Sequence, residues 1–121
     1  MKQCLVVEDS RVVRQIACGI LESLDFETNE AADGVGALQA CRAHMPELIL
    51  LDWNIPDSSG MEFLRSLRRE DGGTVPIVIF CTTENDAGQI EDAMRAGATD
   101  YVLKPYNRQI LSDKLAQVGL I

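Results

Sequence analysis

Five polar residues stand at the ends of short apolar runs of the chain: Glu8, Asp9, Asp52, Thr82 and Lys104. Three carboxylates that gather at one place repel one another, and a divalent cation relieves that repulsion. Oxygen ligands of this kind suit Mg²⁺. An aspartate held beside a metal ion and a lysine is a candidate nucleophile that forms a covalent aspartyl phosphate.

The lysine makes phosphate chemistry the preferred interpretation of this set. The three carboxylates and the Lys104 ammonium sum to a charge of −2, which one Mg²⁺ cancels. A further cation is useful when more negative charge arrives, as a phosphoryl group brings. The Thr82 hydroxyl can donate to a phosphoryl oxygen. The pattern therefore predicts a phosphorylated aspartate at this place.

The elements that position these residues follow from the hydrophobic pattern. Short apolar runs predict strands at 4–7, 26–31, 48–51, 76–81 and 101–103, of which 26–31 is the weakest. Apolar residues at helical spacing predict helices over 13–24, with Ser10 as the N-cap, and over 34–44, 61–67, 86–96 and 110–118.

Strand and helix alternate five times, which predicts a doubly wound, parallel five-stranded sheet in a flavodoxin-like, three-layer α/β/α fold. Ligands of such sheets bind outside the carboxyl ends of the strands. We expect the first, third and fourth strands to be neighbours at the centre, so that the polar residues converge. Residues 1–121 are expected to form one domain with no output domain, because the chain stops just after the last helix.

The composition excludes several classes of protein. The chain has 121 residues, 46% of them hydrophobic, which is enough for a real core. Its 11 basic and 19 acidic residues give a formal net charge of −8, which argues against nucleic acid and anionic membranes as partners. No apolar run is long enough for a membrane span, and the N-terminus lacks a signal-peptide pattern.

The four cysteines form no CxxC pair: Cys4, Cys18, Cys41 and Cys81. A zinc or thioredoxin-like site is therefore not expected, and each is interpreted as a small buried hydrophobe. Reduced thiols of this kind predict a cytoplasmic protein.

Taken together in chain order, the motifs resemble a receiver domain of the two-component response-regulator family, in its single-domain, CheY-like form. The motifs that carry the resemblance are Val7-Glu8-Asp9-Ser10, Leu51-Asp52-Trp53-Asn54-Ile55-Pro56 with Gly60, Thr82-Thr83-Glu84, Ala96-Gly97-Ala98 and Lys104-Pro105. The match extends over nearly the whole chain, and each motif falls at or near the end of an expected strand.

This resemblance implies that Asp52 accepts a phosphoryl group from a sensor histidine kinase or a histidine phosphotransfer protein. It implies that Asp9, Asp52 and the backbone carbonyl of Asn54 bind Mg²⁺ directly, and that Glu8 holds the ion through water. Asn54 and Glu84 flank the site where a hydrolytic water is positioned. The domain is therefore expected to be a switch that catalyses only its own phosphorylation and slow self-dephosphorylation.

The resemblance also implies how the switch is transmitted. Lys104 and Thr82 contact the phosphoryl oxygens, and Tyr101 turns inward when Thr82 moves. The Lys104-Pro105 peptide is expected to be cis. A downstream effector protein is expected to bind a surface of exposed residues on the last elements: Gln89, Asp92, Arg95, Tyr101 and Lys114. The protein is expected to be a monomer, with dimerisation on phosphorylation left open.

Three residues depart from the commonest pattern of the family: Glu8 replaces aspartate, Thr83 replaces a small residue and Tyr106 replaces phenylalanine. None of these changes removes a required group. Trp53 is expected to report metal or phosphate by its fluorescence. His44, at a helix end, is not expected to be a phosphorelay histidine or a metal ligand. The basic face formed by Arg65, Arg68 and Arg69 is expected to be solvated.

Three alternatives remain. An aspartate-nucleophile phosphatase of the haloacid dehalogenase type carries a second aspartate where this chain has Asn54. A flavodoxin-like cofactor binder needs a Gly/Ser/Thr-rich phosphate loop after the first strand, where Glu8 and Asp9 would repel a phosphate. A receiver that serves only as a scaffold would carry no functional phosphorylation.

Overall fold

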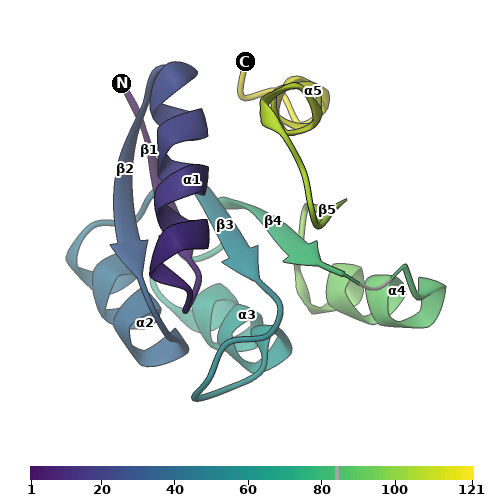
Figure 1. Cartoon of the computed structure of the whole chain (residues 1–121). Coiled ribbons are helices and arrows are strands. Elements are labelled where there is room, and N and C mark those ends of the chain that lie inside the picture. The colour runs from purple at the N-terminus through teal and green to yellow at the C-terminus, as the bar shows by residue number, and fades with distance from the viewer. Residues whose placement is uncertain (84) are drawn as a thin grey trace.

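A computed structural model describes residues 1–83 and 85–121, and within that part the strands form one parallel sheet in the order β2-β1-β3-β4-β5 (Figure 1). The strands are β1 (Lys2–Val7), β2 (Phe26–Ala31), β3 (Leu48–Asp52), β4 (Ile77–Thr82) and β5 (Asp100–Leu103). The helices are α1 (Arg11–Ser23), α2 (Gly34–Ala43), α3 (Gly60–Arg69), α4 (Ala87–Ala96) and α5 (Arg108–Gln117). The predicted doubly wound fold is confirmed.

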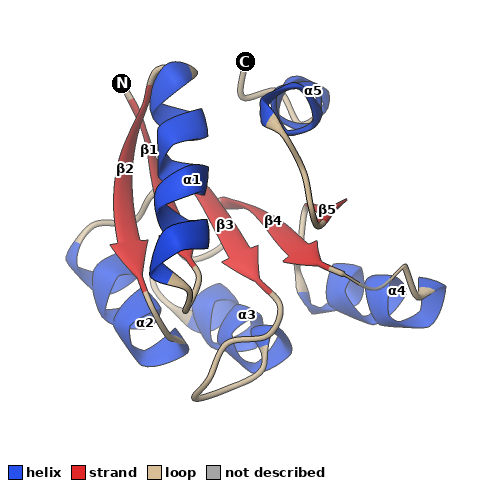
Figure 2. Cartoon of the chain, in the orientation of Figure 1, coloured by secondary structure: helices blue, strands red, loops and turns tan. Residues whose placement is uncertain are grey.

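The sheet lies between two layers of helices (Figure 2). Helices α1 and α5 cover one face, and α2, α3 and α4 cover the other. Alternate residues of a strand point to opposite faces, so Cys4 and Val6 of β1 join one core cluster while Leu5 and Val7 join the other. This explains the continuous apolar runs, since the central strands are buried on both faces.

Capping residues set where the helices begin. The side chains at the N-caps each accept a hydrogen bond from the first turn of their helix: Ser10, Asp33, Ser59, Asp86 and Asn107. Gly97 ends α4 in the left-handed region, with φ of 115°. Among the described residues, the helices fall short of the length and hydropathy that a membrane span needs.

The apolar stripe of α1 is broader than the face that the helix buries. Val13 and Ile16 are among the apolar residues whose helical spacing predicted this helix. The structure buries Ala17, Cys18 and Leu21 against the sheet. It leaves Val13 38% and Ile16 59% exposed. Periodicity correctly predicted the helix, but spacing alone does not say which part of a broad apolar stripe faces the sheet.

The cysteines are buried and form no disulfide, as predicted. Burial raises the pKa of Cys41 to about 11 and that of Cys81 to about 12. Both thiols therefore stay protonated at neutral pH and behave as small apolar side chains.

Arg68 is a structural residue, and its assignment to a solvated basic face was wrong. Its Nε and Nη2 donate to the Gly97 carbonyl at 3.0 and 2.7 Å. Its Nη1 donates to the carbonyls of Gly73 and Pro76 at 2.9 and 2.8 Å. Burial lowers the pKa of this guanidinium. One side chain of α3 thus holds the loop before β4 and the C-terminus of α4.

We expect Arg68→Met to lower the free energy of unfolding by roughly 2 kcal/mol, because it leaves three carbonyl groups without their charged donor. Urea unfolding measures this loss. The matched control is Arg69→Met at an exposed position of the same helix, which should change stability by no more than about 0.5 kcal/mol. Equal losses in the two variants would contradict the assignment.

Candidate functional site

The predicted carboxylates meet at the carboxyl edge of the sheet. Glu8 and Asp9 follow β1, and Asp52 is the last residue of β3, which pairs with β1 in parallel. The arrowheads of these strands point to the same edge in Figure 2. One carboxylate oxygen from each residue lies within 4.8 Å of the others. Glu8 and Asp52 are buried and Asp9 is exposed, so the cluster opens to solvent on one side.

Lys104, from the turn after β5, supplies the positive charge of the cluster. Its Nζ lies 2.8 Å from Glu8 Oε1 and 3.3 Å from Asp52 Oδ1. Burial on its own lowers the pKa of Lys104, but the hydrogen bond to Glu8 and the charges of Asp52 and Glu8 outweigh it and raise this pKa. The ammonium therefore remains charged between two carboxylates that would otherwise repel each other.

Glu8 is held by contacts beyond Lys104. Its second oxygen, Oε2, accepts a hydrogen bond of 3.2 Å from the Ser10 amide. Its carbonyl accepts one of 2.8 Å from Arg14 Nη1, and Arg14 Nε pairs with Glu30 at 2.8 Å. Sequence reasoning missed Arg14, because nothing in its spacing says that the first turn of α1 crosses the end of β2.

The loop 53–59 places Asn54 beside Asp52. The Asn54 amide donates to Asp52 Oδ1 at 3.3 Å, and Asn54 forms a β-bridge with Ser59. The Gly60 amide donates to the Trp53 carbonyl at 3.1 Å. A Cβ on Gly60 would overlap the Trp53 indole, so a glycine is required where the chain passes this ring.

Thr82 and Tyr101 lie on the two strands beyond β3. Thr82 ends β4 and is buried, next in the chain to Cys81, which is opposite Asp52 in the strand register. The Tyr101 ring is 5.8 Å from Phe80, and Phe80 is 4.8 Å from Trp53. A row of aromatic rings thus joins the neighbour of Asp52 to β5, which the sequence did not predict.

The residues predicted for the effector surface lie on α4, β5 and α5. Asp92 and Arg95 are exposed on α4, where they pair at 3.8 Å. Lys114 Nζ lies 5.6 Å above the Tyr101 ring. Gln89 turns toward the site instead, since it lines a cavity of about 550 Å³ together with Asp9, Trp53 and Asn54.

Two of the three departures from the family pattern line a second, mainly apolar cavity. Thr83 and Tyr106 line it with Val13, Ile16, Lys104 and Pro105, over about 360 Å³. Burial raises the pKa of Tyr106, whose hydroxyl is hydrogen-bonded with Cys81. The Lys104-Pro105 peptide is cis, as expected. Glu84, predicted to flank the hydrolytic water, lies outside the described residues.

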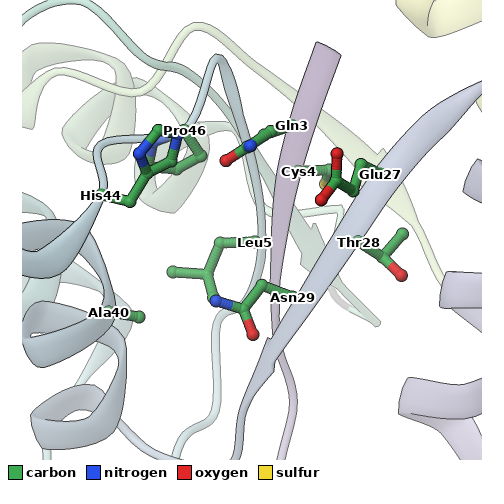
Figure 3. Close-up of a pocket in the computed structure, with 9 residues that line it drawn as sticks. All are labelled: Gln3, Cys4, Leu5, Glu27, Thr28, Asn29, Ala40, His44 and Pro46. Carbon is green, nitrogen blue, oxygen red and sulfur yellow. The ribbon is translucent and has the colours of Figure 1, made fainter. Parts of the chain in front are cut away.

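A third cavity is separate from this site. It has a volume of about 240 Å³ and lies between the first halves of β1 and β2 and the C-terminal end of α2 (Figure 3). His44 and Asn29 are among its lining residues, around the side chain of Leu5. The carboxylate cluster does not contribute to its lining. His44 therefore lies apart from the candidate site.

Known proteins resemble the chain in sequence over nearly its whole length. The family model of the response regulator receiver domain matches residues 4–116. The phosphate regulon transcriptional regulatory protein PhoB of Escherichia coli (strain K12) is 35% identical in an alignment of 121 positions that covers 97% of this chain and 51% of that protein. The chain thus spans about half the length of the curated relatives it matches.

Solved structures agree with this assignment. Chemotaxis response regulator CheY4 of Vibrio cholerae has a TM-score of 0.93 at 30% identity, over 98% of each chain. The receiver domain of the sensor histidine kinase PA1611 of Pseudomonas aeruginosa PAO1, which has a magnesium ion coordinated in its active site cleft, has a TM-score of 0.87 at 28% identity, over 96% of this chain and 95% of that one. The chain belongs to the response regulator receiver domain family of two-component systems.

Proposed function

We propose that residues 1–121 act as a phosphorylation-controlled switch. Asp52 accepts a phosphoryl group from a sensor histidine kinase or a histidine phosphotransfer protein, and the change alters the affinity for a downstream effector. The observation that carries the proposal is the cluster of three carboxylates with Lys104 at the carboxyl edge of the sheet. Four buried, reduced thiols favour the cytoplasm as its compartment.

The cluster fits a magnesium ion. One carboxylate oxygen from each of Glu8, Asp9 and Asp52 lies within 4.8 Å of the others, and carboxylate oxygens are the ligands that Mg²⁺ prefers. Asp9, Asp52 and the Asn54 carbonyl would hold the ion, with Glu8 contacting it through water. When bound, the ion supplies positive charge to the phosphoryl oxygens.

Asp52, Lys104 and Thr82 have separate roles in the proposed phosphoryl transfer. A carboxylate oxygen of Asp52 forms the new bond to phosphorus as the phosphorus–nitrogen bond of the phosphohistidine breaks. The leaving imidazole keeps the bonding electron pair and takes up a proton. Lys104, now 3.3 Å from Asp52, would pair with the transferred phosphoryl oxygens, and the Thr82 hydroxyl would donate to one of them.

An exposed apolar surface beside the site supports a protein as the phosphoryl donor. Val12 is 66% and Ile16 is 59% exposed on α1, and the 360 Å³ cavity continues this surface to Pro105 and Lys104. A partner that presents a phosphohistidine to Asp52 must approach this edge of the sheet. Burial of these side chains against such a partner would stabilise the encounter.

The aromatic row provides a route from the site to the effector surface. Thr82 moves toward the phosphoryl group, which leaves room for Tyr101 to turn inward beside Phe80. That movement separates Tyr101 from Lys114 and changes the surface that includes Asp92 and Arg95. The phosphoryl group acts by favouring one of two existing arrangements.

Family membership removes the support for the phosphatase and cofactor-binding alternatives. The scaffold alternative differs from the switch only in whether Asp52 is phosphorylated, so labelling decides between them. Slow self-dephosphorylation belongs to the proposal, with Asn54 beside the acceptor to orient a water.

We expect Asp52→Asn to abolish labelling by acetyl phosphate with Mg²⁺, because an amide oxygen is too weak a nucleophile to form the acyl phosphate. Intact-protein mass spectrometry detects the added phosphoryl group. Asp33→Asn, which alters an aspartate at the start of α2, is the control and should be labelled like the parent chain. Undiminished labelling of Asp52→Asn would refute the acceptor assignment and favour a scaffold.

We expect Lys104→Met to lower the free energy of unfolding without metal by about 1–3 kcal/mol, because Glu8 and Asp52 lose the cation between them. Millimolar Mg²⁺ should restore most of this loss, since an ion replaces the missing charge. Urea unfolding with and without Mg²⁺ measures both effects. Lys2→Met, at an exposed lysine, is the control and should change neither the free energy of unfolding nor its response to Mg²⁺. If Mg²⁺ does not restore the stability of Lys104→Met, the proposed metal site is contradicted.

Beryllofluoride with Mg²⁺, a mimic of the phosphoryl group, should move the Tyr101 ring away from Lys114. The ring is half-buried and its loss of contact with the ammonium changes its chemical environment. Proton–carbon NMR spectra of the ring report the change. Asp52→Asn should show no such response, and a Tyr101 signal that stays unchanged in the parent chain would remove this residue from the switch.

A further inference from the structure

Asp57 joins two segments that are far apart in the sequence. It is an exposed residue of the loop 53–59 between β3 and α3. Its Oδ1 accepts a hydrogen bond of 2.7 Å from the Gly34 amide, and its Oδ2 accepts one of 2.9 Å from the Val35 amide. Both amides belong to the first turn of α2, where helix N–H groups lack partners within the helix.

This contact is additional to the N-cap of the helix itself. Asp33 caps α2 in the ordinary way, through a 2.7 Å hydrogen bond from the Gly36 amide to its Oδ1. Two carboxylates from different segments therefore accept hydrogen bonds from the amides of one helix N-terminus, and the helix dipole there favours negative charge. The hydrogen bonds from Gly34 and Val35 lower the pKa of Asp57, so its carboxylate stays ionised near neutral pH.

The close approach of the loop depends on a glycine. A Cβ on Gly34 would lie 2.6 Å from Ser58 Oγ, 3.2 Å from Asp57 Oδ1 and 3.3 Å from Ile55 Cδ1. A larger residue at this position would displace the Ser58 hydroxyl and crowd the Asp57 carboxylate. The first turn of α2 and the loop 53–59 are thus packed against each other and joined by two charged hydrogen bonds.

The same loop carries a proposed metal ligand. Asn54 lies three residues before Asp57, and both line the 550 Å³ cavity that also includes Asp9. The two ends of the loop are joined by the bridge between Asn54 and Ser59. Asp57 ties the middle of the loop to α2, three residues after Asn54.

We infer that Asp57 is a positioning residue, which holds the Asn54 carbonyl toward the metal by clamping the loop to α2. The inference rests on the proposed function, because it concerns the affinity of that site for Mg²⁺. The mechanism is indirect: the Asp57 carboxylate stays on the helix amides and does not touch the metal. Groups that orient metal ligands in this way contribute strongly to metal affinity.

The test is the dissociation constant for Mg²⁺, measured by calorimetry on the full chain. Asp57→Ala should weaken binding roughly tenfold, the lower end of the effect seen when an orienting group is removed. Asp57→Asn keeps one acceptor oxygen and should fall between this variant and the parent. Hydrogen exchange should be faster at the Gly34 and Val35 amides in Asp57→Ala.

Asp33→Ala is the matched control, because it removes a carboxylate cap from the same helix without touching the loop. It should lower stability and leave the Mg²⁺ dissociation constant unchanged. Equal weakening in Asp33→Ala and Asp57→Ala would overturn the inference in favour of a general effect of α2. Unchanged Mg²⁺ binding in Asp57→Ala, with faster exchange at Gly34, would also overturn it. Absence of Mg²⁺ binding by the parent chain is a different result, which removes the proposed metal site and this inference together.

Discussion

Repulsion among carboxylates at one edge of the sheet is the constraint on which the site depends. Glu8 and Asp52 are buried there, and Asp9 lies at the solvent side of the same cluster. A single ammonium, from Lys104, lies between the two buried groups. The folded chain therefore holds more negative charge at this point than its own residues neutralise. That excess attracts a divalent cation and, with it, the phosphoryl chemistry proposed for Asp52.

The parallel sheet makes this concentration of charge possible. Because β1, β3 and β4 run side by side in one direction, the residues that end them meet at one edge. The same arrangement places Thr82 one residue beyond the partner of Asp52 in the strand register, and it lets aromatic rings from β4 and β5 pack in a row with Trp53. The same neighbouring strands therefore carry both the carboxylate cluster at the edge and the row of aromatic rings.

Charged side chains bound to backbone groups tie helices on one face of the sheet to neighbouring segments. Arg68 ties the C-terminus of α4 to α3, and Asp57 ties the loop 53–59 to α2. Both contacts join the helices on one face of the sheet through charged side chains bound to backbone groups. The switch proposed here needs such fixed points, since the movement proposed for Tyr101 is transmitted only if the surrounding elements stay in place.

The sequence by itself determined the order of elements, the parallel fold and the cluster formed by Glu8, Asp52 and Lys104, because hydrophobic period and residue type are local properties. It misassigned Arg68 to a solvated face, since charge does not report what lies opposite a side chain. Only the tertiary structure decided the clamp of Asp57 on α2, the row of aromatic rings and the direction of Gln89. These depend on which segments approach each other in space, and sequence separation carries no information about that approach.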